Sequence, residues 1–173
     1  MPVKTAGKLG QNICSVEVAD RSFSDSALRR ISDLYKSSRY YREFFPKLAT
    51  AFAEGSQTNL LAAMNTHLID LFRGEFDISM QVVRSSEIPT QGKRGEKVAR
   101  ICEALGIDTY ISPWGAAKYL ALDIEYFQDR RIDVYLHAYE HPVYTQAFKP
   151  FISHASVVDL RMNEGEKSSY ILR

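Results

Sequence analysis

The sequence predicts an α/β fold in which a layered, mostly parallel sheet is flanked by helices. Three observations support this prediction. Short β-branched segments alternate with amphipathic helical segments along the chain. No internal repeat, low-complexity tract or long linker interrupts them. The content of 45% apolar and 25% charged residues is close to the globular average. We therefore expect a single domain over residues 1–173.

The first half of the chain is predicted to hold one strand and three helices. Residues 13–18 alternate and are rich in β-branched side chains, which indicates a strand. A helix should follow from a cap at Ser22 or Ser24, since apolar residues then recur with helical spacing. Residues 44–54 and 59–72 show the same periodicity and predict two more helices.

The second half is predicted to alternate strands and helices. In order we expect a strand over 76–84, a helix over 93–105 ended by Gly106, a strand over 108–112, a helix over 116–130, a strand over 132–139, and a last helix capped by Ser156 and ended by Gly165. The three strands should share one sheet, with the helix over 93–105 packed on it. Asp159, in the first turn of the last helix, is predicted to serve the helix N-terminus.

The strand over 132–139 has two contrasting faces. Ile132, Val134, Leu136 and Ala138 point one way, and Asp133, Tyr135, His137 and Tyr139 point the other. An acid, two phenols and an imidazole are costly to bury without partners. This face should therefore meet a ligand, a polar network or solvent.

Two loops follow strands at the edge where α/β proteins bind ligands. One spans 85–96 and contains Lys93 and Arg94, which could hold a phosphate or form a solvated surface loop. The other spans 112–116 and carries Trp114, which would be either a core plug or a substrate wall.

Neither a metal nor a cofactor is expected. His137 and His141 are four residues apart in extended chain, about 13 Å, which is too far for one ion. No Walker loop or nucleophile elbow is present. Cys14 and Cys102 are predicted to be buried small hydrophobic residues.

Charge and composition also limit which binding partners and which compartment we expect. With 22 basic and 21 acidic residues the net charge is +1, so we expect no nucleic acid, although residues 36–42 interleave bases with aromatic rings. No apolar run approaches the ~20 residues of a membrane span, and the N-terminus carries no signal-like apolar stretch. Two cysteines fit a reduced, cytoplasmic compartment, and no oligomeric state is indicated.

Several motifs resemble the WbqC-like protein family. They are Tyr110-Ile-Ser-Pro-Trp-Gly-Ala-Ala-Lys-Tyr-Leu120, His141-Pro-Val-Tyr-Thr-Gln146, Phe148 with Phe151, Ser156-Val-Val-Asp-Leu160 and Asn163-Glu-Gly165. The resemblance covers nearly the whole chain, but the family's usual opening segment is absent. We therefore expect this chain to match the C-terminal two-thirds of a family member, with exposed apolar surface where the rest would pack. Arg161 also departs from the pattern, which usually has an apolar residue there.

The resemblance implies a bacterial protein of O-antigen or other surface-polysaccharide biosynthesis. Its expected activity is that of a transferase that adds an acyl or aminoacyl group to a nucleotide-linked or lipid-linked sugar. The alternative is a non-catalytic sugar-binding or scaffold protein of the same pathway.

A candidate site combines these motifs. Because parallel strands end at one rim, we expect a single cleft lined by Ser112, Trp114, Gly115, Tyr119, Tyr144 and Gln146. His141 is the predicted general acid or base, and His137 is the second candidate. Alternatively, His141 is a turn histidine held by Pro142.

Overall fold

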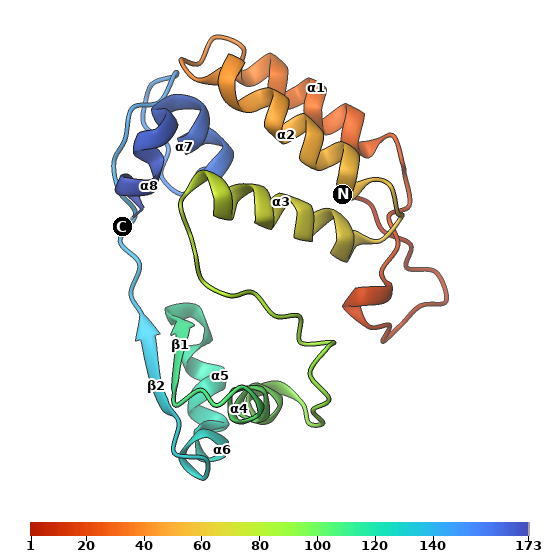
Figure 1. Cartoon of the computed structure of the whole chain (residues 1–173), viewed down its shortest axis with the longest axis vertical. Coiled ribbons are helices and arrows are strands. Elements are labelled where there is room, and N and C mark those ends of the chain that lie inside the picture. Colours follow the sequence, from red (N-terminus) through yellow and green to blue (C-terminus); the bar gives the residue numbers. More distant parts are fainter. Residues whose placement is uncertain (173) are drawn as a thin grey trace. The chain divides into compact units, whose positions relative to one another are not determined.

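The computed structural model describes residues 1–172 and divides into two compact units (Figure 1). Unit 1 combines Met1–Met80 with the chain from His141 onward, and unit 2 is Gln81–Glu140. The assignment of residues 1–173 to a single domain stays a prediction. Within the described residues, no helix has the length and apolar character needed to cross a bilayer.

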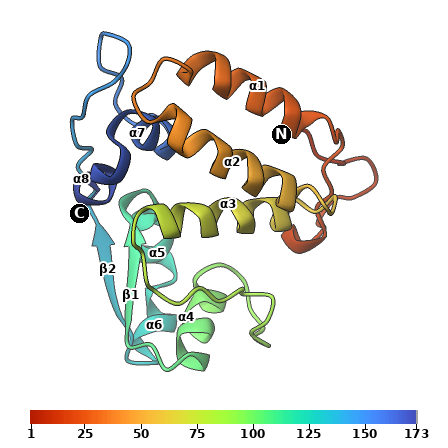
Figure 2. The ribbon, with the colours of Figure 1, turned by 45° about the horizontal axis from the view of Figure 1, so that its top comes forward.

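Unit 1 is built from helices. They are α1 (Phe23–Tyr35), α2 (Tyr41–Gly55), α3 (Leu61–Glu75), α7 (Val157–Glu164) and α8 (Ser168–Ile171), with short 3-10 turns at Ile13–Ser15 and Gly165–Lys167. Figures 1 and 2 both show α2 lying between α1 and α3. The core beneath them contains Phe44, Leu48, Phe52, Met64 and Met162. The three helices predicted in the first half of the chain are confirmed.

Both ends of α7 form as predicted. The Ser156 hydroxyl accepts a hydrogen bond from the Val158 N–H at 3.2 Å, as a helix cap does. Gly165 ends the helix at φ 61°, and an added Cβ there would lie 2.5 Å from the Tyr40 ring. A glycine is therefore required here by both the backbone and the neighbouring ring.

The predicted strand over residues 13–18 is wrong. Residues Ile13–Ser15 form a 3-10 turn, and only isolated bridges follow, from Glu17 to Leu60 and from Val18 to Val3. Cys14 is consequently exposed, which corrects its predicted burial. The alternation in this segment has no neighbouring strand to pair with over its length.

The predicted strand over residues 76–84 is also wrong. Phe76 ends α3 and is buried, and Asp77 turns the chain at φ 52°. From there the backbone forms no regular structure, and Ile78, Met80 and Val82 are exposed. Alternating apolar residues do not make a strand when no partner edge satisfies their backbone groups.

Unit 2 confirms the α/β class on a small scale. Its elements are α4 (Arg94–Ala104), β1 (Thr109–Pro113), a 3-10 turn at Trp114–Ala116, α5 (Ala117–Leu122), α6 (Ile124–Gln128) and β2 (Asp133–His137). The two strands pair in parallel, with Thr109 opposite Asp133 and Pro113 opposite His137. Among residues 1–172 these two strands form the sheet, and the larger layered sheet that the sequence predicts is not seen.

The core of unit 2 lies between the sheet and its helices. Ala99 and Cys102 of α4 meet Leu120, Phe127 and Ile132 there. The predicted packing of this helix on the two strands and the burial of Cys102 are confirmed, and burial raises the pKa of the Cys102 thiol. Gly106 follows α4 at φ 66°, as expected for a residue that ends a helix.

The predicted helix over 116–130 is divided in the structure. Asp123 lies between α5 and α6 at φ −115° and ψ 11°, which is outside helical geometry. Its carboxylate accepts a hydrogen bond from the Gly95 N–H at 3.0 Å, at the start of α4. Asp123 therefore stabilises α4 from another segment, a role that local periodicity does not reveal.

Candidate functional site

The carboxyl ends of β1 and β2 bring together several predicted site residues in unit 2. Because Pro113 pairs with His137, the imidazole of His137 lies at the point where β1 leads into the Trp114–Ala116 turn. His137, Trp114 and Gly115 are all exposed at this end of the sheet. A Cβ added to Gly115 would meet no atom of the described residues within 4 Å, so a ligand could approach its backbone closely.

Aromatic rings at this end of the sheet face solvent. Trp114 is 66% exposed and Tyr119 is 67% exposed, which excludes the core-plug interpretation of Trp114. The Arg94 guanidinium carbon lies 6.0 Å from the centre of the Tyr119 ring. The site therefore offers two flat apolar surfaces with a cation beside one of them.

Ser112 lies below this surface. It is only 1% exposed, and its hydroxyl oxygen has no hydrogen-bond partner in the described residues. Its neighbour two residues earlier, Tyr110, packs into the unit 2 core and stacks on Phe127 at 5.4 Å. Side chains two apart in a strand share a face, so Ser112 faces the core side of β1.

The start of α4 is not an open phosphate cradle. The Asp123 carboxylate already accepts the Gly95 N–H, and the Arg94 Nε lies 3.4 Å from the same carboxylate. A Cβ on Gly95 would come within 2.4 Å of the Asp123 Cβ, so glycine is needed for this close approach. An internal anion thus takes the position that a phosphate would need, which favours the solvated-loop alternative for Lys93 and Arg94.

His141 belongs to a cluster of rings in unit 1. Its imidazole centre lies 4.6 Å from that of His154, 6.0 Å from Tyr144 and 6.1 Å from Phe151. His154 was not singled out from the sequence, because it is thirteen positions away in an irregular segment. His141 is half-buried and lies beside three other rings, whereas the alternative interpretation considered only a turn held by Pro142.

Tyr144 and Gln146 converge on a buried carboxylate. Tyr144 donates its hydroxyl hydrogen to Asp159 Oδ2 at 2.7 Å, and the Gln146 amide donates to the same oxygen at 2.9 Å. Asn163 donates to Asp159 Oδ1 at 3.2 Å. Asp159 lies in the first turn of α7, as predicted, and its carboxylate also accepts side-chain hydrogen bonds from two segments.

The same network fixes the loop before α7. The Gln146 amide donates to the Ile152 carbonyl at 2.9 Å and accepts from the Ile152 N–H at 2.8 Å. Burial, together with the negative charge and hydrogen bonding of Asp159, raises the pKa of Tyr35 on α1. Four motif residues that are apart in sequence are thus joined in one polar cluster: Tyr144, Gln146, Asp159 and Asn163.

The expectation of one cleft joins residues of the two units. Ser112, Trp114, Gly115 and Tyr119 belong to unit 2, whereas His141, Tyr144 and Gln146 belong to unit 1. The structure groups the residues within each unit, and the single cleft stays a prediction. Among residues 1–172, no group of three or more histidine, cysteine, aspartate or glutamate side chains is placed to hold a metal ion.

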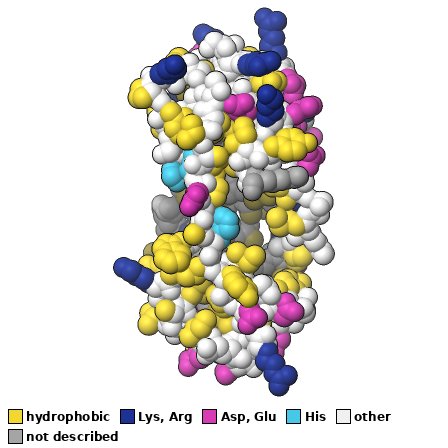
Figure 3. All heavy atoms as spheres, turned by 90° about the vertical axis from the view of Figure 1, so that its left-hand side faces the viewer, with side chains coloured by type: hydrophobic (Ala, Val, Ile, Leu, Met, Phe, Trp, Pro, Cys, Tyr) yellow, Lys and Arg dark blue, Asp and Glu magenta, His cyan; other side chains and the backbone are white. Residues whose placement is uncertain are grey.

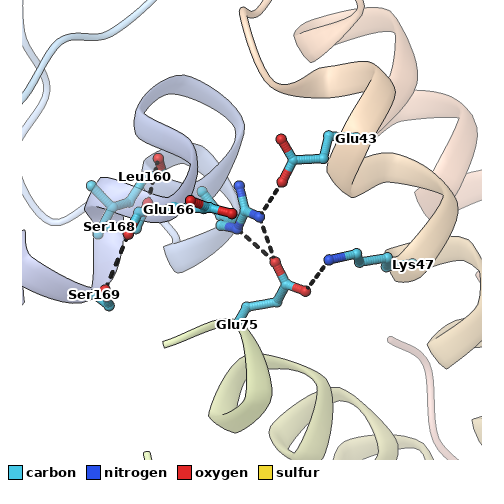
Figure 4. A network of polar contacts seen from close by, with 8 residues as sticks. Glu43, Lys47, Glu75, Leu160, Glu166, Ser168 and Ser169 are labelled. Atoms are coloured by element: carbon cyan, nitrogen blue, oxygen red, sulfur yellow. Dashed lines mark hydrogen bonds and ion pairs between the residues drawn. The ribbon is translucent and has the colours of Figure 1, made fainter. Parts of the chain in front are cut away.

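Arg161 departs from the family pattern, and unit 1 supplies it with partners. Its side chain is 2% exposed and binds Glu43 on α2 and Glu75 on α3, with an Arg161 Nη2 to Glu75 distance of 2.7 Å. Lys47 binds the other side of Glu75 at 2.7 Å (Figure 4). The guanidinium also lies over the Phe44 ring at 5.4 Å. The pKa of Arg161 is raised by these carboxylates despite burial, so it stays charged.

Comparison with known proteins places this sequence in a family. The model of the WbqC-like protein family matches residues 1–171. The chain belongs to the WbqC-like family. A relative described as the uncharacterized protein Rv1507c of Mycobacterium tuberculosis is 24% identical over 174 residues, covering 100% of this chain and 74% of the relative. No solved structure shows a significant match.

The family match bears on function through the name of the family and through the residues that the match covers. The name of the family suggests involvement in polysaccharide or O-antigen biosynthesis and specifies no reaction. The matched region includes both the Trp114 turn and the Asp159 network.

Proposed function

We propose that this chain is a cytoplasmic bacterial protein of surface-polysaccharide biosynthesis that transfers an acyl or aminoacyl group to an activated amino-sugar. The observation that carries the proposal is the register of β1 and β2, which sets the exposed His137 opposite Pro113 and beside the Trp114 turn. Aromatic rings suit the apolar face of a sugar, and an imidazole can move a proton at neutral pH.

In this reaction the sugar nitrogen attacks the carbonyl carbon of the acyl donor. The new C–N bond forms as the bond from that carbon to the donor's leaving atom breaks. The imidazole takes the proton from the attacking nitrogen and returns it to the leaving group. His137 is the favoured base because it lies in the same unit as Trp114, and His141 in unit 1 is the second candidate.

Trp114 and Tyr119 supply the sugar-binding surface in this proposal. Gly115 lets the backbone approach the ligand, and the Ser112 hydroxyl, which has no partner among the described residues, is left as a further polar group for the ligand. Tyr144 and Gln146 belong to unit 1, where their side chains bind Asp159 and hold the loop that follows His141.

Binding can be measured through Trp114 because it is the only tryptophan of the chain. Titration with a uridine-diphosphate amino-sugar should change its fluorescence, and Trp114→Ala should weaken the binding measured by calorimetry by about tenfold or more. Unchanged affinity in that variant would overturn the placement of the sugar.

Turnover is tested by mass spectrometry of the same sugar incubated with acyl-coenzyme A and aminoacyl donors. His137→Gln should lower the rate by roughly 10²–10⁴-fold while sugar binding is kept. His67→Gln is the matched control, since His67 is an exposed histidine of α3 that belongs neither to the Trp114 surface of unit 2 nor to the rings around His141. If His141→Gln alone abolishes turnover, the base is His141 and the choice of His137 is wrong.

A non-catalytic sugar-binding protein is the second candidate function. It is favoured by the two-thirds exposure of Trp114 and Tyr119, because active sites usually exclude water around the reacting atoms. Binding to the wild-type chain without product from any donor would support this alternative and refute the transferase.

A further inference from the structure

The β1–β2 sheet has one face covered by helices and one face open. Tyr110 and Val134 point toward the core formed with α4, α5 and α6. Ile111 and Tyr135, which pair with each other, point the opposite way, and Tyr135 is 58% exposed. Figure 1 shows the three helices on one side of the strands within unit 2.

Three rings follow one another on the open side of β2. Tyr135 and His137 alternate in β2, so their side chains share a face, and Tyr139 follows two residues beyond the end of the strand. Two residues of strand advance about 6.6 Å, which is the expected step from Tyr135 to His137. The His137 and Tyr139 ring centres are 6.1 Å apart at an interplanar angle of 24°. We call these three residues the aromatic row.

The aromatic row combines apolar surface with polar groups. All three rings are exposed, and Figure 3 shows hydrophobic side chains gathered at the surface on this side of unit 2. Two phenol hydroxyls and the imidazole nitrogens lie along the row, and Asp133 occupies the next position on the same face. Flat apolar faces edged by hydrogen-bonding groups suit a sugar ring, which has apolar C–H faces and hydroxyl groups at its edge.

The row is also continuous with the proposed reaction site. His137 is both its central ring and the residue opposite Pro113, directly before the Trp114 turn. A ligand that starts at Trp114 can therefore extend over His137 onto Tyr135 or Tyr139. With steps of about 6–7 Å, the row is longer than a single sugar ring.

We propose that the aromatic row binds an acceptor saccharide of several consecutive sugar residues, with the modified sugar at the Trp114 end. This inference rests on the proposed function and deepens it, because it assigns the acceptor to oligosaccharides, such as the glycan of a lipid-linked intermediate. The exposed rings of the row orient the saccharide by stacking against its sugar rings, while His137 contacts its terminal sugar.

The test measures calorimetric binding of the full chain to cellohexaose, chitohexaose, maltohexaose and xylohexaose and to their monosaccharides. At least one hexasaccharide should bind about tenfold or more tightly than its monosaccharide. Tyr135→Ala should remove most of that gain, and Tyr135→Phe should keep it because stacking needs the ring and not the hydroxyl. Phe148→Ala is the control for loss of an exposed aromatic ring in unit 1.

Three results would overturn the inference. The first is that no hexasaccharide binds better than its monosaccharide. The second is that Tyr135→Ala leaves hexasaccharide affinity unchanged. The third is a wild-type dimer in solution that Tyr135→Ala dissociates, which would assign this face to a second copy of the chain. Uridine-diphosphate sugar binding at Trp114 and its turnover are measured without hexasaccharide, so failure of the proposed function is distinguished from failure of the aromatic row.

Discussion

Replacing Arg161 with methionine tests whether its buried ion network stabilises unit 1. Methionine restores the apolar character that the family resemblance leads one to expect, and its flexible side chain can pack against the Phe44 ring beside which the guanidinium lies. The change removes the cation between Glu43 and Glu75, which come from α2 and α3. The two carboxylates then keep Lys47 as their remaining neighbour, bound to Glu75.

The size of the effect follows from the exposure of each partner. Removing one member of a fully buried ion pair costs about 3–5 kcal/mol. Here the Glu43 side chain is 46% exposed and can be hydrated, whereas the Glu75 side chain is 10% exposed and keeps only Lys47. Arg161 Nη1 has no hydrogen-bond partner within residues 1–172, so the cost of burying it also disappears. We therefore expect Arg161→Met to lower the free energy of unfolding by about 2 kcal/mol.

Acid should reduce this difference. Burial alone would raise the pKa of Glu75, but hydrogen bonds and charges from Lys47 and Arg161 outweigh it and hold the pKa below its ordinary value of 4.5. A carboxylate with a lowered pKa in the folded state contributes stability above pH 4.5 and loses it as pH falls through the folded pKa. The gap between wild type and Arg161→Met should accordingly narrow below that pH.

Urea unfolding followed by far-ultraviolet circular dichroism measures these free energies. Arg100→Met is the matched control, since Arg100 forms a surface pair with Glu96 at 3.0 Å and should cost no more than about 0.5 kcal/mol. Glu75→Gln in the Arg161→Met background should cost less than it does in the wild type, because the ion pair is already lost. Equal losses in Arg161→Met and Arg100→Met would refute the reasoning.

Three further changes test other contacts. Gly95→Ala places a Cβ 2.4 Å from the Asp123 Cβ and should lower the free energy of unfolding by about 1–3 kcal/mol, whereas Gly74→Ala, with nothing within 4 Å, should not lower it; equal urea midpoints would contradict this. Asp159→Asn replaces the carboxylate that accepts hydrogen bonds from Tyr144, Gln146 and Asn163, and it should lower the free energy of unfolding by about 1–3 kcal/mol. A wild-type urea midpoint in this variant would disprove the structural role of Asp159. The raised pKa of Tyr35 means that stability should fall as pH rises above 10.0, where the unfolded phenol ionises first; ultraviolet titration should show this tyrosine ionising late, and earlier in Asp159→Asn.

Helices and their ends were largely predictable from the sequence because their signals are local. The apolar spacing over 23–35 and 94–104, the Ser156 cap and Gly106 each act within a few residues of one another. The alternation of 132–139 likewise predicted a strand, and its residues 133–137 pair in parallel with β1, whereas residues 138 and 139 lie outside the strand. The resemblance in the motifs around Trp114 and Asp159 was enough to indicate the family.

Contacts between distant segments were decided only by the tertiary structure. The alternation of 76–84 resembles that of β2, but no strand among residues 1–172 pairs with it. A strand is stable only when a neighbour satisfies its backbone groups. The candidate site shows the same limit: Tyr144 and Gln146 were chosen as ligand contacts, yet their side chains meet Asp159.

Arg161 illustrates the physical reason most clearly. The sequence alone marked it as a departure from an apolar pattern, and its partners Glu43 and Glu75 lie 118 and 86 positions away. A charge can be buried only where opposite charges meet it. Sequence periodicity determines which face of a helix is apolar, whereas only the packing of α2, α3 and α7 determines which charges meet beneath it.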